Sequence, residues 1–192
     1  KIYPKLCLEG PRNQSTSNND GGFGQFYGIQ SCEDGLSNTK VKDAIEKAAE
    51  MGKVPAAMVM AIWQIESGCA HVNTADPIND DSLLTENNKT CVARGNCDVR
   101  GPFQILKSTF EDYIQKQSFI SCRAAIGVDT GSAPNRSRWG DALCVSAVKL
   151  GNDGGNVAPQ NWTIANVENA AFGYLGACKD QEFEYCDIAK TN

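Results

Sequence analysis

Nine cysteines in 192 residues constrain this chain more than any other feature of its sequence. Zinc sites favour close Cys-x-x-Cys pairs, and the sequence has none; it also offers a single histidine, His71. We therefore predict a disulfide framework, with neither a metal nor another cofactor. Because nine is odd, at least one thiol is free or pairs with another chain. The cysteines are Cys7, Cys32, Cys69, Cys91, Cys97, Cys122, Cys144, Cys178 and Cys186.

A disulfide framework indicates where the protein resides. Disulfides persist in oxidising compartments, so we expect an extracytoplasmic protein that is secreted, periplasmic or held at the cell surface. The sequence starts with Lys1 instead of Met, as expected for a mature or shortened product. Cys91 with Cys97, and Cys178 with Cys186, are candidates for short loops, although spacing alone leaves the connectivity open.

Charge and hydropathy exclude two classes of partner. The net charge is -5, so there is no basic excess to neutralise phosphates, and we predict no binding to nucleic acid. The longest apolar run, 54–65, is interrupted by Pro55 and Gln64 and is too short to span a bilayer. The length and the 41% apolar content suit one soluble globular domain.

Composition also divides the chain. The first 36 residues are polar, and 13–22 contain no apolar side chain. Such a segment buries too little surface to fold by itself. We predict a tail or wrapping segment over 1–36 and a single folded domain over 37–192.

Periodicity predicts a mainly α domain. A first helix capped by Asn38 or Thr39 runs through 41–48, with Gly52 just past its end. A second covers 56–66 and stops at Gly68; it is apolar on nearly every face and should lie in the core.

Later helices are predicted from capping and composition. One starts near Ser108, which precedes Glu111 by three residues as in a capping box. Two more cover 141–150 and 167–175, and residues 127–140 are a loop. Strand signals are weak and leave room for a small β-hairpin between residues 70 and 99.

Glu66 is the first candidate for chemistry, because it closes the apolar helix. Desolvation by Ile62 and Trp63, together with the negative end of the helix dipole, would raise its pKa. A carboxyl protonated near neutral pH is what a glycosidase needs to protonate a departing glycosidic oxygen. The alternative is an ordinary exposed glutamate, which the local sequence alone favours.

The segment Gly101-Pro102-Phe103-Gln104 is the second candidate. It predicts a tight turn that presents an amide beside an apolar platform. The Gln104 amide would hydrogen-bond a sugar hydroxyl or N-acetyl group, and Phe103 would support a sugar face. A loop that merely enters a helix is an equally good reading of this segment alone.

Together the two segments resemble the lytic transglycosylase and lysozyme-like superfamily. Glu66-Ser67 is similar to the Glu-Ser pair that ends a buried helix there. Gly101–Gln104 with Ser108-Thr109 resembles the family's Gly-x-x-Gln segment and helix start. Two weaker similarities follow, in Trp139-Gly140-Asp141-Ala142 and in Ala170-Ala171-Phe172-Gly173-Tyr174, where the family's tyrosine lies near the acid. The resemblance covers about residues 40–187.

The resemblance implies a lysozyme-like helical domain with long disulfide-braced loops. It implies cleavage of the β-1,4 bond between MurNAc and GlcNAc in peptidoglycan, with Glu66 as a single acid and base and a 1,6-anhydro-MurNAc product. The residues that would bind substrate are Ser67, Gly101, Phe103, Gln104 and Tyr174. Peptidoglycan glycan strands would be the partner.

Hydrolysis by a muramidase is the nearest alternative, but it usually needs a second carboxylate. No carboxylate has a motif position for that role, although four lie between the two main motifs: Asp76, Asp80, Asp81 and Asp98. Trp139 and Trp162 would either stack on sugars or simply pack.

The sequence departs from the family pattern at three points. Lys107 stands where the family often has Pro, and Leu175 where it often has Asn. Gln104 follows Glu66 by 38 positions, a long gap that indicates a disulfide-stapled insertion. A non-catalytic peptidoglycan-binding module, or a disulfide-rich surface protein, therefore also stays open.

Overall fold

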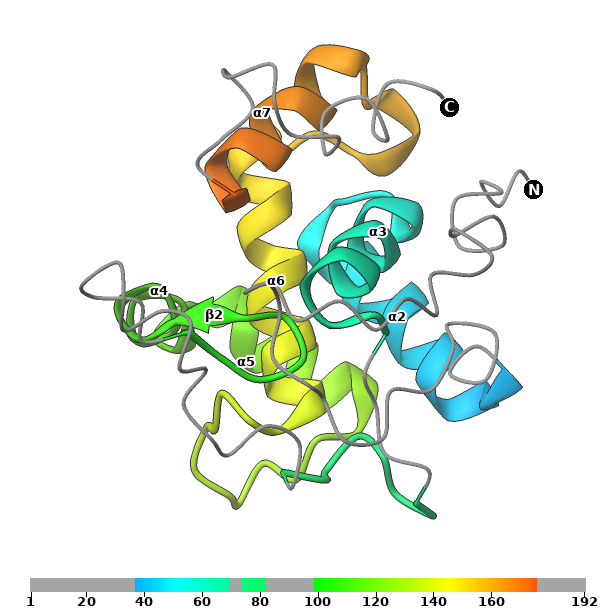
Figure 1. Ribbon diagram of the computed structural model, residues 1–192, viewed down its shortest axis with the longest axis vertical. Coiled ribbons are helices and arrows are strands. Elements are labelled where there is room, and N and C mark those ends of the chain that lie inside the picture. Colours follow the sequence, from blue (N-terminus) through cyan, green and yellow to red (C-terminus); the bar gives the residue numbers. More distant parts are fainter. Residues whose placement is uncertain (1–36, 70–73, 82–98, 176–192) are drawn as a thin grey trace, which may run out of the picture.

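The computed structural model describes residues 37–69, 74–81 and 99–175 (Figure 1). The predicted tail over 1–36, His71, Asp98 and the two candidate short-loop cysteine pairs lie outside these residues. Helices predominate in the described part, as the sequence predicts. The helices are α2 (Thr39–Gly52), α3 (Ala56–Ser67), α4 (Lys107–Ile114), α5 (Gln117–Ile126), α6 (Trp139–Asp153) and α7 (Ile164–Leu175), with a 3-10 turn at Pro159–Asn161.

Helix α2 begins as predicted and ends one residue later than predicted. The side chain of Asn38 accepts a hydrogen bond from the Lys40 N–H at 3.1 Å, which caps the helix. Gly52 is the last helical residue, and Lys53 takes the left-handed cap conformation. Gly52 serves packing instead, because a Cβ there would lie 2.4 Å from the carbonyl oxygen of Ala147 in α6.

Helix α3 lies in the core and stops at Gly68, as predicted. Gly68 has a φ of 61°, and its N–H bonds to the Gln64 carbonyl at 2.7 Å. The Cys69 N–H bonds to the Trp63 carbonyl at 3.3 Å, so two N–H groups beyond the helix end bond back to its last turns. This cap fixes the direction in which the chain leaves the helix just after Glu66.

A β-hairpin is present at 99–106, while most of the region 70–99, where the sequence left room for one, lies outside the described residues. Strands β1 (Val99–Arg100) and β2 (Ile105–Leu106) pair antiparallel, so residues 101–104 form the turn between them. Helix α4 follows β2 directly and has Leu106 at its N-cap, without a side-chain cap. The predicted cap at Ser108 is therefore wrong. Glu111 instead makes an exposed ion pair with Lys107 at 3.8 Å.

Helix α6 forms the centre of the described fold (Figure 1). It is longer than the predicted 141–150, and nearly all of its side chains are buried. It packs against α2, α5 and α7. Helix α5 was not predicted, although Phe119, Cys122 and Ile126 are spaced for one buried face.

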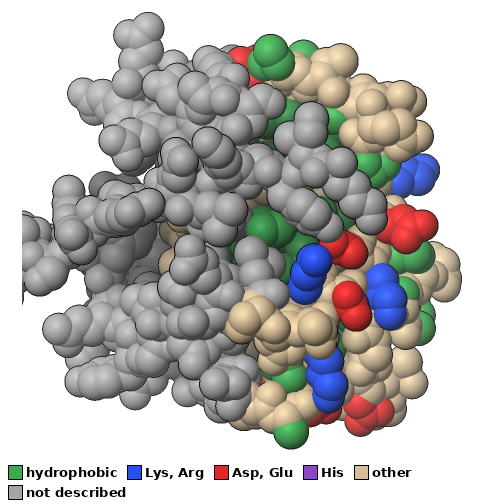
Figure 2. All heavy atoms as spheres, turned by 90° about the vertical axis from the view of Figure 1, so that its right-hand side faces the viewer, with side chains coloured by type: hydrophobic (Ala, Val, Ile, Leu, Met, Phe, Trp, Pro, Cys, Tyr) green, Lys and Arg blue, Asp and Glu red, His purple; other side chains and the backbone are tan. Residues whose placement is uncertain are grey.

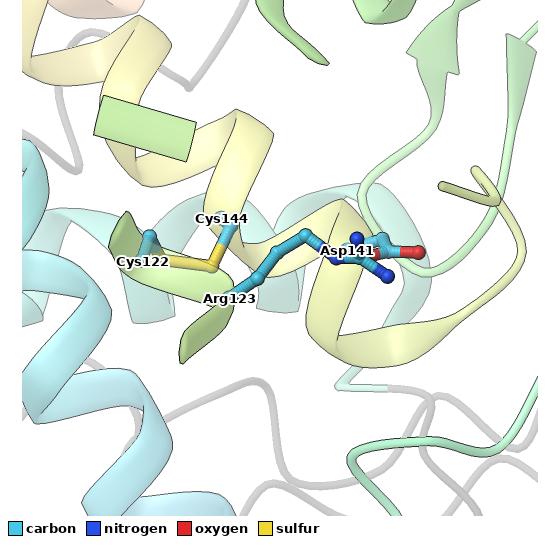
Figure 3. The surroundings of a disulfide bond; sticks show 4 residues. All are labelled: Cys122, Arg123, Asp141 and Cys144. Carbon is cyan, nitrogen blue, oxygen red and sulfur yellow. A yellow bond between two sulfur atoms is a disulfide. The ribbon is translucent and has the colours of Figure 1, made fainter. Parts of the chain in front are cut away.

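A disulfide joins Cys122 of α5 to Cys144 of α6 (Figure 3), and Cys69 is also disulfide-bonded.

Among the described residues, no helix is long and apolar enough to cross a membrane. No group of three or more metal-ligating side chains occurs in that part either. On the face shown in Figure 2, the described acidic and basic side chains are intermixed.

Candidate active site

Glu66 occupies the last turn of α3, where it is half-buried. Burial raises its pKa from the ordinary value of 4.5 to about 7. Within the described part of the chain, no hydrogen bond or ion pair reaches its carboxyl group. An acid of this kind is half protonated near neutral pH, so it can both give and take a proton there.

Three buried aromatic rings connect the end of α3 to the turn of the hairpin. Trp63 stacks with Phe103 at a centroid distance of 6.4 Å and meets Trp139 edge-on at 5.5 Å. Trp63 is one helical turn before Glu66 and therefore on the same side of α3. Phe103 directly precedes Gln104. The aromatic cluster thus holds the segment of Glu66 beside the segment of Gln104.

The position of Phe103 does not support its predicted sugar contact. Its side chain is 0% exposed, so its ring has no face to offer a ligand. Trp139 is likewise 0% exposed and packs, the alternative that the sequence left open. Trp162 also serves packing, since its indole N–H donates to the carbonyls of Lys53 at 3.0 Å and Val157 at 3.2 Å.

The turn has a geometry that only a glycine at position 101 allows. Gly101 has a φ of 77°, and a Cβ there would lie 2.0 Å from the carbonyl oxygen of Arg136. The sequence predicts Gly101 as a substrate contact. In the structure, Gly101 allows the backbone conformation of the turn. The Gly101 carbonyl accepts from the Gln104 backbone N–H at 3.1 Å and from the Gln104 side-chain amide at 2.9 Å.

The side-chain oxygen of Gln104, Oε1, is available to a ligand. It is half-buried, and its Nε2 is bonded within the turn. Its Oε1 has no hydrogen-bond partner among the described residues. For the predicted amide contact, Oε1 is thus an available acceptor, suited to a sugar hydroxyl or to the N–H of an N-acetyl group, and Nε2 keeps a second hydrogen to donate.

The other two predicted substrate contacts lie differently from what the sequence indicated. Ser67 is 3% exposed and its hydroxyl donates to the Trp63 carbonyl at 3.2 Å, so it is not placed to contact a ligand. Tyr174 donates to the Phe103 carbonyl at 2.8 Å and also bonds Ser146. It joins the site through the backbone of the turn.

Two of the candidate second carboxylates accept hydrogen bonds from asparagine side chains. Asp76 accepts from Asn79 at 2.9 Å, and Asp81 accepts from Asn135 at 3.3 Å. Both are exposed, and Asp80 is half-buried. No hydrogen bond links any of these three described carboxylates to Glu66.

A buried charge cluster supports the turn, and sequence reasoning missed it. Asp141 is 0% exposed and lies 2.7 Å from Arg123 Nε and 2.8 Å from Arg138 Nη1. Figure 3 shows Arg123 reaching from α5, beside the disulfide, to Asp141. Burial raises the pKa of Asp141, while the Asn135 N–H and the two guanidinium groups oppose this shift. The sequence signal that could have indicated this cluster is a pair of opposite charges, Arg123 and Asp141, on two helix faces that are otherwise mostly apolar.

This cluster fixes loop 127–138 against the turn. Arg123 donates to the carbonyls of Asp129 at 3.0 Å and Ser132 at 2.9 Å. From the same loop, Arg136 places its carbonyl against Gly101 and donates from Nη1 to the Ile105 carbonyl at 3.2 Å. The conformation of the turn therefore depends on the buried charges of Arg123, Arg138 and Asp141, which hold this loop.

Comparisons with models of protein families, with curated proteins and with solved structures found no match to this chain. The chemistry of the site therefore rests on its own residues. These supply one acid titrating near pH 7 and one amide acceptor, on segments that the aromatic cluster holds together.

Proposed function

We propose that this chain is a peptidoglycan lytic transglycosylase that cleaves the MurNAc-GlcNAc β-1,4 bond, with Glu66 as its single general acid and base. One observation carries the proposal: a half-buried carboxyl with a pKa of about 7 ends a helix packed against the turn that presents Gln104. The motif resemblance around Glu66 and Gln104 supports the same reading.

The reaction needs two proton transfers by one group. Protonated Glu66 gives its proton to the glycosidic oxygen as the bond to C1 of MurNAc breaks, and GlcNAc leaves with a free 4-hydroxyl. The Glu66 carboxylate then takes the proton of the MurNAc 6-hydroxyl as O6 bonds to C1. The product is a 1,6-anhydro end, no water is consumed, and Glu66 is again protonated.

Gln104 would orient the sugar in this scheme. Its Oε1 accepts a hydrogen bond from an N-acetyl N–H or a hydroxyl. Hydrolysis by a muramidase is the second candidate. It is less favoured because glycoside hydrolysis usually uses two carboxylates, and the sequence gives no second carboxylate a motif position.

The test is Glu66→Gln, assayed on purified peptidoglycan with mass spectrometry of the released muropeptides. General acid catalysis is worth about 10² to 10⁴ in rate, so we expect a loss of at least about 100-fold in a folded protein. Glu111→Gln is the matched control, since Glu111 lies exposed on α4 and should keep full activity.

The products separate the alternatives. Anhydro ends support the proposal, and reducing ends assign a muramidase instead. Binding to insoluble peptidoglycan without released muropeptides indicates a binding module. Undiminished turnover by Glu66→Gln would rule out Glu66 as the acid.

A further inference from the structure

A chain of two hydroxyl groups runs from the core to the turn. Ser146, in the middle of α6, is 0% exposed, and its Oγ lies 2.8 Å from the Tyr174 hydroxyl. That hydroxyl donates its single proton to the Phe103 carbonyl at 2.8 Å. Ser146 must therefore be the donor to Tyr174, because each hydroxyl has one hydrogen to give. The direction is Ser146 to Tyr174 to Phe103.

The carbonyl at the end of this chain belongs to the peptide bond that leads into Gln104. Gln104 has a φ of 47°, a conformation that costs a residue with a Cβ about 1–2 kcal/mol and persists only where its surroundings hold it. The ring of Phe103 is held on the other side by Trp63 and Trp139. Ring and carbonyl are thus both restrained.

Contacts of Lys149 between α6 and α7 hold Tyr174 in place. Lys149 pairs with Asp153 at 2.6 Å and donates to the Gly173 carbonyl at 2.9 Å. Its ammonium group lies 5.9 Å from the centre of the Tyr174 ring. A Cβ at Gly173 would lie 2.5 Å from the Asp153 carboxylate, so α7 approaches α6 closely here.

We propose that Ser146 and Tyr174 are a positioning pair, which holds the Phe103–Gln104 peptide so that Gln104 Oε1 faces the ligand. Neither residue needs to touch substrate in this role. The effect that we expect of this pair on activity rests on the proposed function. Its expected effect on the conformation of the turn does not.

The test compares Tyr174→Phe, Ser146→Ala and the double variant by two measurements. The first is hydrogen exchange of the Gln104 backbone N–H by NMR, which reports the turn in the absence of substrate. The second is kcat and KM on a soluble, uncross-linked glycan strand. Tyr113→Phe is the control, because Tyr113 is a half-buried tyrosine of α4 outside this network.

We expect Tyr174→Phe to speed Gln104 exchange and to raise KM, each about ten-fold, with kcat changed less than about two-fold. A group that binds the ground state and the transition state equally affects KM alone. Ser146→Ala should give a smaller change of the same kind, about three-fold. The double variant should match Tyr174→Phe, because Ser146 acts through Tyr174.

Different failures point to different errors. Unchanged Gln104 exchange in Tyr174→Phe would overturn the positioning pair, and so would faster exchange at unchanged KM. Additive effects in the double variant would remove Ser146 from the pair. If the wild-type chain leaves the glycan strand intact, the proposed function fails, and hydrogen exchange still decides whether the pair holds the turn.

Discussion

At the scale of single residues, burial separates the candidates that motif matching had placed together. Glu66 and Phe103 were both expected to meet substrate. Glu66 is half-buried and its pKa is raised, while Phe103 is completely buried. Within the segments Glu66-Ser67 and Gly101–Gln104, burial thus leaves Glu66 and Gln104 as the two side chains available to a ligand.

The pKa of Glu66 predicts how stability depends on pH. Its folded-state pKa of about 7 lies above the unfolded value of 4.5, so the folded state binds more protons between these values. Stability should therefore fall as pH rises from about 4.5 to 7 and level off above, by at most roughly 3 kcal/mol for this group.

Urea denaturation at pH 5 and pH 8 measures this dependence. Glu66→Gln has no proton to lose, so its stability should fall less across the same interval. An identical fall in both proteins would show that Glu66 does not carry the shift.

At the scale of elements, the hairpin turn is shaped by what lies against it. Two strands of two residues each cannot hold a turn by their own hydrogen bonds alone. Arg136 blocks the position of a Cβ at Gly101, and Tyr174 holds the Phe103 carbonyl. The conformation of the turn therefore depends on tertiary contacts as much as on its own sequence.

Gly101→Ala should destabilise the fold by about 2–4 kcal/mol, since it adds a steric clash with Arg136 to the cost of a positive φ. Gly127→Ala is the matched control: its φ is 82°, but nothing lies within 4 Å of the added Cβ. That variant should lose only about 1 kcal/mol. Equal losses in urea denaturation would mean that contact with the loop is unimportant.

At the scale of the whole molecule, α6 links every part of the site. It carries Trp139 in the aromatic cluster, Asp141 in the charge cluster, Cys144 in the disulfide and Ser146 in the hydroxyl chain. Helices α2, α5 and α7 all pack on it. Damage to this helix should therefore affect stability and site together.

Asp141→Asn should cost about 3–5 kcal/mol, because it leaves two buried guanidinium groups without their counter-charge. Asp153→Asn, on the same helix, removes a carboxylate that is 23% exposed and should cost only about 1 kcal/mol. Thermal and urea denaturation compare the two. A cost of Asp141→Asn no larger than that of Asp153→Asn would contradict a structural role for the cluster.

Several elements were predictable because their signals are local. The cap at Asn38, the apolar run of α3 and its stop at Gly68 are set by neighbours within a few residues. The sequence by itself therefore determined a mainly helical fold, the burial of α3 and the position of Glu66 at its end. Short-range hydrogen bonds and the 3.6-residue period suffice for these features.

Other features were decided only by the tertiary structure. Phe103 turned inward, Ser67 bonded to its own helix, and Gly52 served a contact with α6 instead of a cap. The pairing of Ser146 with Tyr174 joins residues 28 positions apart. Such outcomes depend on which helices meet, since burial and hydrogen bonding are properties of the assembled core and not of a segment. For the same reason, the sequence marked Glu66 as a candidate acid, while packing around it raised its pKa to about 7.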